Sequence, residues 1–145
     1  MGAFLVLCLA ESRTVKEWQQ TEALARRVFP EATGFVHVTL PLNQAEKDTL
    51  QLLVVEKNNE VAGYAIIDDV KGKDQPITYC VIVDEKLAVK SVEILAYREP
   101  YGGEIQNSSW LKQFFGKQPN DELRQGREVK NITGATISSR AITLG

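Results

Sequence analysis

The chain has 145 residues, of which 43% are hydrophobic and 25% are charged, and its formal net charge is −2. This length suits one domain with a sizeable core and is too short for two, and the composition is that of an ordinary globular protein. The negative charge argues against a sequence-independent grip on nucleic acid, so we expect no nucleic-acid partner.

The first 11 residues leave two alternatives open. Residues 3–10 are apolar, but they are too few to span a bilayer. They fit either the end of a leader or anchor segment or a first structural element packed on the domain. We therefore place one domain at residues 12–145.

The next elements are expected to be a helix, a strand and a second helix. Residues 12–29 predict an amphipathic helix, because Ser12 is a suitable N-cap and Pro30 follows the end; the apolar positions are Val15, Trp18, Leu24, Ala25 and Val28. Residues 34–40 alternate and predict a strand. Asn43 and Glu46 resemble a capping box, so we expect a second helix from Asn43 towards Val54, with Leu50 and Leu53 on one side.

The middle of the chain is expected to form a sheet. Three β-type runs, residues 61–70, 77–83 and 87–97, are joined by the short polar links 71–76 and 84–86. Short links favour antiparallel neighbours. The predicted fold class is therefore α+β, with an antiparallel sheet (meander) and flanking helices in a single domain.

The C-terminal third predicts two more helices. Residues 108–115 form a short amphipathic helix that ends at Gly116, with Trp110, Leu111, Phe114 and Phe115 on its apolar side. Residues 119–130 are polar and are interpreted as a surface connection. A last helix begins at Thr136.

No set of residues suggests hydrolytic or metal chemistry. Cys8, Cys80 and His37 lack zinc-type spacing, so we interpret Cys80 as a buried structural thiol and His37 as a strand residue. The acidic pair Asp68-Asp69 lacks a third ligand at useful spacing and is interpreted as a solvated face. We assign no catalytic residue and no metal.

The first candidate site is the segment 131–139, Asn-Ile-Thr-Gly-Ala-Thr-Ile-Ser-Ser. The start of a helix offers unpaired backbone N–H groups and a positive dipole end, which suit a phosphate. Gly134 and Ala135 allow close approach to the backbone. The same segment also fits a plain turn with Thr133 as the helix cap, or a general phosphate or nucleotide site.

The second candidate site is the segment 97–105, Tyr-Arg-Glu-Pro-Tyr-Gly-Gly-Glu-Ile, which follows the third β-type run. Together with the aromatic stretch 110–117, these motifs resemble the FMN-binding domain family, which includes the flavin-carrying subunits of bacterial sodium-pumping and related membrane redox complexes. The resemblance covers roughly the last two thirds of the chain, judged by motif order. It implies that a flavin transferase, using FAD, attaches FMN to Thr136 through a phosphoester.

The resemblance also implies which residues meet the cofactor. On the phosphate side these are Thr136, Thr133, Gly134, Ala135, Ser138 and Ser139. On the ring side they are Tyr97, Arg98, Glu99, Gly102, Gly103, Glu104 and Ile105. Chemically, a Gly-Gly backbone allows close approach to the ring, Tyr97 supplies an aromatic plane, and Arg98 and Glu99 would tune the flavin potential in opposite directions.

One position departs from the family pattern. The family usually has an Asp three residues before the first hydroxyl residue of the motif, where this chain has Lys130. The difference bears on recognition by the transferase, and hence on covalent attachment, more than on flavin binding. Lys130 would instead pair with the phosphate as a point charge.

The resulting hypothesis is an FMN-binding electron-transfer protein, a carrier rather than a catalyst acting on a substrate. Redox partner proteins and a flavin transferase are the expected partners. The resemblance implies membrane association on the extracytoplasmic face of a bacterial membrane or in the periplasm. The alternative is a non-enzymatic sensor or adaptor domain of the same fold that binds flavin reversibly or not at all.

Overall fold

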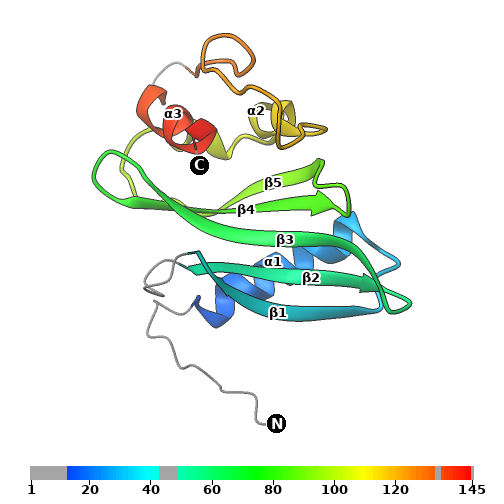
Figure 1. Ribbon diagram of the computed structural model, residues 1–145. Helices are drawn as coiled ribbons and strands as arrows, with labels where there is room; N and C mark the ends of the chain where they lie inside the picture. The colour runs from blue at the N-terminus through cyan, green and yellow to red at the C-terminus, as the bar shows by residue number, and fades with distance from the viewer. Residues whose placement is uncertain (1–12, 43–48, 133–134, 145) are drawn as a thin grey trace.

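The protein is an antiparallel sheet with helices on both faces (Figure 1). The computed structural model describes residues 13–42, 49–132 and 135–144. In chain order the elements are α1 (Val15–Val28), β1 (Gly34–Pro41), β2 (Thr49–Lys57), β3 (Glu60–Lys71), β4 (Pro76–Asp84), β5 (Val89–Ala96), the 3₁₀ turn η1 (Gly103–Gln106), α2 (Ser108–Leu111), the 3₁₀ turn η2 (Lys112–Phe114) and α3 (Thr136–Leu144). The strands pair in sequence order, each antiparallel to the next. The predicted α+β fold and meander are therefore confirmed.

Helix α1 begins later than the sequence suggested. Its N-cap is Thr14, whose hydroxyl accepts from the Glu17 N–H at 3.1 Å while the Glu17 carboxylate accepts from the Thr14 N–H at 2.9 Å. This reciprocal pair is a capping box. Ser12, the predicted cap, lies outside the described residues. Val15 is 73% exposed, so its predicted place on the apolar side was wrong.

The predicted second helix, from Asn43 towards Val54, was also wrong over the part that the structure describes. Residues 43–48 lie outside the described residues, and Thr49–Lys57 is strand β2. Leu50, Leu53 and Val54 have helical spacing, but they belong to an almost continuous apolar run, and periodicity cannot separate such a run from a buried strand. Successive residues of β2 point to opposite faces of the sheet, and both faces are covered. Leu53 packs towards α1, while its neighbour Leu52, which is also buried, points the other way.

The alternating side chains of β4 divide the core in two. Cys80 and Ile82 belong to a cluster with α1, whereas Ile77 and Tyr79 belong to a cluster with the C-terminal helices. Figure 1 shows the same division, with α1 on one face and α2 and α3 on the other. Cys80 is fully buried, as predicted, and burial raises its thiol pKa to about 12.

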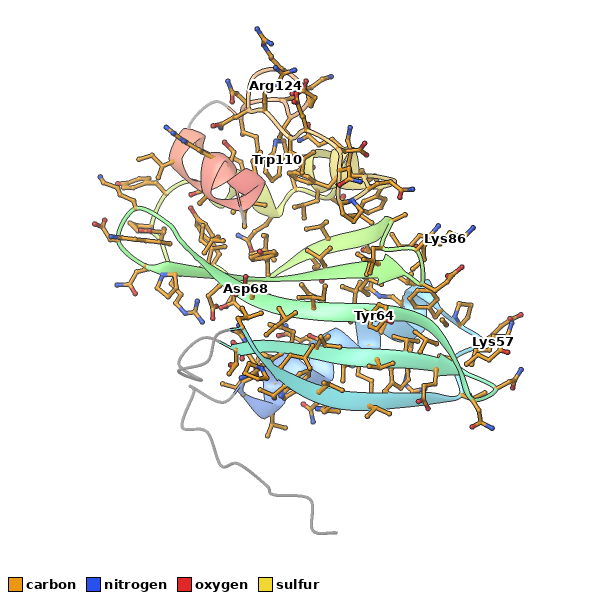
Figure 2. The ribbon with its side chains drawn as sticks, viewed as in Figure 1. Lys57, Tyr64, Asp68, Lys86, Trp110 and Arg124 are labelled. Atoms are coloured by element: carbon orange, nitrogen blue, oxygen red, sulfur yellow. The ribbon has the colours of Figure 1, made fainter. Side chains whose placement is uncertain are left out.

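The C-terminal layer is anchored by two aromatic residues. Trp110 and Phe114 are 8% and 5% exposed and meet edge to face, with ring centroids 5.2 Å apart. Figure 2 shows Trp110 directed into this layer. Phe115, which was predicted on the same side, is 40% exposed. The chain passes from α2 into a 3₁₀ turn before Phe115, and this tighter turn changes the side-chain spacing so that Phe114 points in and Phe115 out.

The meander also determines which turns share an end of the sheet. The β2–β3 and β4–β5 turns, with Lys57 and Lys86, lie at one end (Figure 2). At the other end β3 turns into β4, and β5 ends with Ala96 opposite Thr78. The loop after β5 therefore emerges beside the β3–β4 turn.

Candidate functional site

A pocket of about 450 Å³ lies at that second end of the sheet. Three segments line it: Lys73 and Asp74 of the β3–β4 turn, Glu99, Pro100, Tyr101 and Gly102 of the loop after β5, and Ala135, Ile137 and Ser138 at the start of α3. Small-molecule pockets usually enclose roughly 300–1,000 Å³. The two segments that the sequence singled out thus border one cavity of suitable size.

Tyr97 joins the loop to α3. Its hydroxyl donates to the Tyr101 carbonyl and lies 2.8 Å from the Ser138 hydroxyl. Because the tyrosine has a single hydroxyl proton, Ser138 is the donor in the second contact. Gly102 sits in this junction with a φ of +86°, and an added Cβ would lie 2.6 Å from the Tyr97 hydroxyl oxygen. Close packing of the loop on α3 therefore requires glycine here.

Glu99 joins the loop to the β3–β4 turn. Its Oε1 accepts from the backbone N–H groups of Asp74 at 2.7 Å and Gln75 at 2.9 Å. These hydrogen bonds, with Gln75 contributing most, lower the pKa of Glu99, since they stabilise its charged form. The carboxylate is thus ionised at neutral pH and already occupied by the turn.

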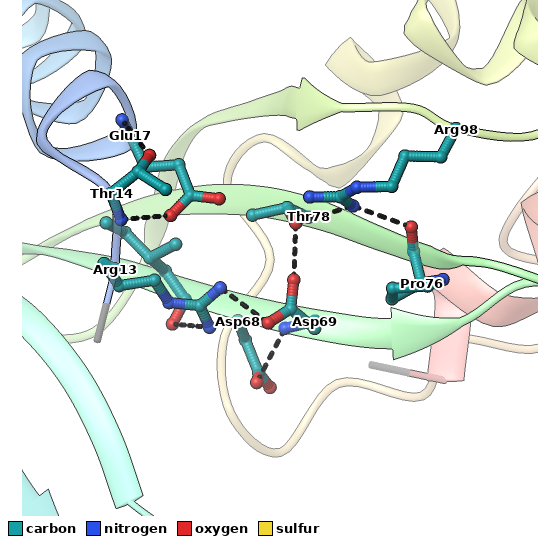
Figure 3. A network of polar contacts seen from close by, with 9 residues as sticks. Arg13, Thr14, Glu17, Asp68, Asp69, Pro76, Thr78 and Arg98 are labelled. Atoms are coloured by element: carbon teal, nitrogen blue, oxygen red, sulfur yellow. Dashed lines mark hydrogen bonds and ion pairs between the residues drawn. The ribbon is translucent and has the colours of Figure 1, made fainter. Parts of the chain in front are cut away.

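Arg98 belongs to a polar network (Figure 3). Its Nη1 donates to the Pro76 carbonyl at 2.9 Å and to the Thr78 hydroxyl at 3.1 Å. Thr78, fully buried, donates in turn to Asp69, which pairs with Arg13 at 2.6 Å. The network ties the loop to the sheet and to the segment before α1, and Arg98 is not among the described residues that line the pocket.

On the predicted phosphate side, the structure describes part of the motif. Thr136 is the first residue of α3, while its side chain lies outside the described part, as do Thr133 and Gly134. Ala135 and Ile137, on either side of Thr136, both line the pocket. The start of α3 therefore borders the cavity, which is the placement that a phosphate site at Thr136 needs.

Ser138 and Ser139 have different surroundings. Ser138 lines the pocket, whereas Ser139 is fully buried and accepts from the Gln125 side chain at 2.6 Å. The carbonyl of Ser139 also accepts from the Thr143 hydroxyl. Of the two serines, Ser138 is the one placed to meet a ligand in this pocket.

The remaining predicted residues do not line this pocket. Lys130 is exposed, and its backbone accepts from the Trp110 indole at 2.7 Å and donates to the Gln113 side chain at 2.7 Å. Ile105 is fully buried in the C-terminal core. Gly103 and Glu104 line a second hollow, which shares Pro100, Tyr101 and Gly102 with the first. The structure thus groups Glu99, Gly102, Ala135 and Ser138 most closely.

Five of the described pocket residues were missed by the sequence reasoning. Lys73 and Asp74 belong to a link interpreted only as short and polar, while Pro100, Tyr101 and Ile137 lie inside the two motifs without an assigned role. Tyr101 is 84% exposed and Ile137 is 54% exposed. Two large exposed apolar side chains at the mouth of one pocket indicate a binding site. The sequence does not show this signal, because only the fold brings the two residues together.

These features fit a flavin. The ring system needs apolar surface against its face and polar groups along its pyrimidine edge, and the phosphate needs N–H donors. Tyr101 and Ile137 offer the apolar surface, and the β3–β4 turn offers the polar groups. The start of α3 offers the N–H donors. The donor set does not suit a metal, and within the described ranges no three His, Cys, Asp or Glu residues gather closely enough to hold one. Across those same ranges, every helix is too short or too polar to span a bilayer.

Comparison with known proteins agrees with this geometry. Over 155 residues the chain is 28% identical to one of the subunits of the Na⁺-translocating ferredoxin:NAD⁺ oxidoreductase complex of Acetobacterium woodii, an alignment that covers 91% of this chain and 74% of that protein. Residues 72–145, from the β3–β4 turn to the end of α3, match the FMN-binding domain. This match spans half of the chain and includes every described residue that lines the pocket. The chain belongs to the FMN-binding domain family.

Proposed function

We propose that this protein holds FMN through a phosphoester to Thr136 and acts as an electron carrier between redox proteins. The observation that supports it most is the shared pocket, which the loop at residues 99–102 and the start of α3 line together. A ring in the pocket and a phosphate at Thr136 are then compatible with one bound molecule. Family membership supports FMN as that molecule.

The attachment is a group transfer from FAD. The Thr136 hydroxyl oxygen bonds to the flavin-side phosphorus of FAD, the bond from that phosphorus to AMP breaks, and AMP leaves with the hydroxyl proton. The N–H groups at the start of α3 suit the phosphoester, since they favour negative charge. A flavin transferase is the expected catalyst, as the family resemblance implies.

Electron transfer follows from the kind of site. FMN supplies one-electron and two-electron chemistry when bound. The exposure of Tyr101 and Ile137 leaves the pocket mouth accessible, so a redox partner can approach closely. The similar Acetobacterium woodii protein belongs to a redox complex, which supports redox proteins as the partners here.

The proposal extends to location. We place the protein on the extracytoplasmic face of a bacterial membrane, where a covalent tether prevents loss of a flavin that cannot be replaced. Residues 1–12, which include the candidate leader or anchor, lie outside the described residues. Fractionation of the cells that naturally make the protein is the measurement, and recovery in the cytoplasmic fraction would contradict this placement.

The central test is mass spectrometry after co-expression with a flavin transferase. We expect the mass of the wild-type protein to rise by one FMN less one water. Thr136→Ala should abolish the increase, and Thr136→Ser, which retains a hydroxyl, should preserve at least part of it. The modified peptide should contain residue 136.

The other outcomes separate the alternatives. A yellow protein that loses its colour on dialysis binds flavin reversibly, and this result would contradict the tether. A protein that is colourless after co-expression, both before and after dialysis, would favour the sensor or adaptor alternative. Lys130→Asp restores the acid usual in the family, so attachment that appears only in that variant would assign the difference to recognition by the transferase.

A further inference from the structure

We propose that residues 72–75, the β3–β4 turn, form a flavin-contacting wall of the pocket, and that Glu99 is the positioning residue that holds this wall in place by accepting hydrogen bonds. The inference rests on the proposed flavin site. It assigns a role to a turn that no sequence motif marked, and it changes the role of Glu99 from a group that touches the ring to one that supports the turn.

The contacts of Glu99 are directed at the backbone of the turn. One carboxylate oxygen accepts from two successive N–H groups, those of Asp74 and Gln75, at 2.7 and 2.9 Å. Charge-assisted bonds of this kind are roughly twice as strong as neutral ones. Hydrogen bonds donated by backbone N–H groups depend on the position of the turn and not on its side chains, so this contact suits a structural clamp.

Gly72 shows that the turn is fitted closely to Glu99. The Gly72 N–H donates to the Gln75 carbonyl at 3.0 Å, which closes the turn. A Cβ on Gly72 would lie 2.7 Å from that carbonyl oxygen and 2.8 Å from Glu99 Oε1. A side chain at this position would displace either the turn or the carboxylate, so both are held against a glycine backbone.

The clamped turn presents two charged residues to the cavity. Lys73 and Asp74 both line the pocket, opposite in charge and adjacent in the chain. The polar edge of a flavin ring requires donors and acceptors, and these two residues supply both kinds. Residues 73–75 of the turn are exposed, so the Glu99 contacts contribute to fixing the position of the turn relative to the ring.

The clamp is tested first in flavin-free protein, by hydrogen exchange of the backbone amides of Asp74 and Gln75. Glu99→Ala removes the acceptor, so we expect both amides to exchange at least about tenfold faster. Glu99→Gln keeps an acceptor oxygen and removes the charge, so exchange should stay within about threefold of wild type. Glu85→Ala, in the turn at the opposite end of the sheet, is the matched control and should leave both amides unchanged.

The wall is tested in protein loaded with FMN by co-expression with a flavin transferase, using iodide quenching of flavin fluorescence. If the turn covers part of the ring, Glu99→Ala should increase the quenching constant about twofold or more, while Glu99→Gln and Glu85→Ala should resemble wild type. Both Glu99 variants remove the negative charge, and only Glu99→Ala removes the acceptor. A higher quenching constant in Glu99→Ala alone therefore cannot be caused by the loss of charge.

Each result decides one part of the proposal. Unchanged amide exchange in Glu99→Ala would overturn the clamp, and faster exchange with unchanged quenching would overturn the wall. Equal effects of Glu99→Ala and Glu99→Gln would show that charge rather than hydrogen bonding is required, which also overturns the positioning role. A wild-type protein that takes up no flavin refutes the proposed function and with it the contact, while the exchange rates still decide the clamp.

Discussion

The two faces of the sheet are stabilised differently. On the α1 face, a continuous apolar cluster of Leu53, Val55, Ala65, Cys80 and Ile82 packs against one regular helix. On the other face, short helices and loops are joined by specific polar contacts, such as Tyr97 with Ser138 and Trp110 with the Lys130 carbonyl. The pocket lies on this second side, at the sheet end. Apolar clusters support both faces, and on the second face hydrogen-bonded loops also provide the binding geometry.

The largest expected effect separates these two roles. Ile82→Ala removes a fully buried side chain under α1 and should lower the free energy of unfolding by about 2–5 kcal/mol. Ile142→Ala, on α3, should cost a similar amount because Ile142 is 6% exposed in the opposite cluster. Denaturant unfolding measures both. Only Ile142→Ala should also alter the visible circular dichroism of bound flavin, and an equal change in Ile82→Ala would break the comparison.

The next effect isolates the junction of the loop with α3. Gly102 and Gly116 have φ values of +86° and +80°, so alanine should cost about 1 kcal/mol of backbone strain at either. At Gly116 an added Cβ meets nothing within 4 Å, whereas at Gly102 it meets the Tyr97 and Ser138 hydroxyls. Gly102→Ala should therefore be the more destabilising by about 1–2 kcal/mol. It should also reduce flavin loading, measured as the absorbance ratio of flavin to protein, and Gly116→Ala should not.

A smaller effect is expected from the polar network below the loop. Thr78→Val keeps the shape of a fully buried residue but removes the hydroxyl that links Arg98 to Asp69. We expect a loss of about 1–2 kcal/mol in unfolding free energy, because Asp69 and Arg98 each lose a partner. Thr39→Val, at an exposed position in β1, is the matched control and should cost nothing measurable. A neutral Thr78→Val would show that the network does not stabilise the loop.

The sheet was predictable because its signals are local. The three middle strands are β-rich runs separated by short polar links, and such links leave few alternatives to antiparallel pairing. Strand β2 was missed because Leu50, Leu53 and Val54 match a helical pattern, and only burial on both faces reveals the strand. The cap at Thr14 shows a similar limit, since Ser12 is an equally good residue in sequence.

The site was predictable only where residues cluster in the chain. The loop at residues 97–105 and the segment at 131–139 were found because each is a compact motif, and the fold does bring them to one pocket. The roles of their members were harder to predict, since Tyr97 and Arg98 use their polar groups on Ser138 and Thr78, partners that the fold alone supplies. The β3–β4 turn joined the site because antiparallel order places it beside the end of β5, a consequence of topology without a sequence motif.

The smallest expected effect concerns the charges that this turn presents to the pocket. Reduced flavin is more negative than oxidised flavin, so the positive charge of Lys73 should favour reduction, and Lys73→Gln should lower the midpoint potential. A tenfold change in the ratio of the two forms corresponds to about 30 mV for a two-electron couple, and we expect a shift of this order or less, because the exposed side chain is screened by water and salt. Asp74→Asn should move the potential the opposite way.

Lys71→Gln removes the same charge from the end of β3, outside the pocket, and is the matched control. Redox titration at low and high ionic strength provides the measurement, and the difference between Lys73→Gln and Lys71→Gln should shrink as salt is added. Equal shifts in the two lysine variants at low salt would mean that the potential responds to net charge alone, and that the turn is no closer to the flavin than the neighbouring strand.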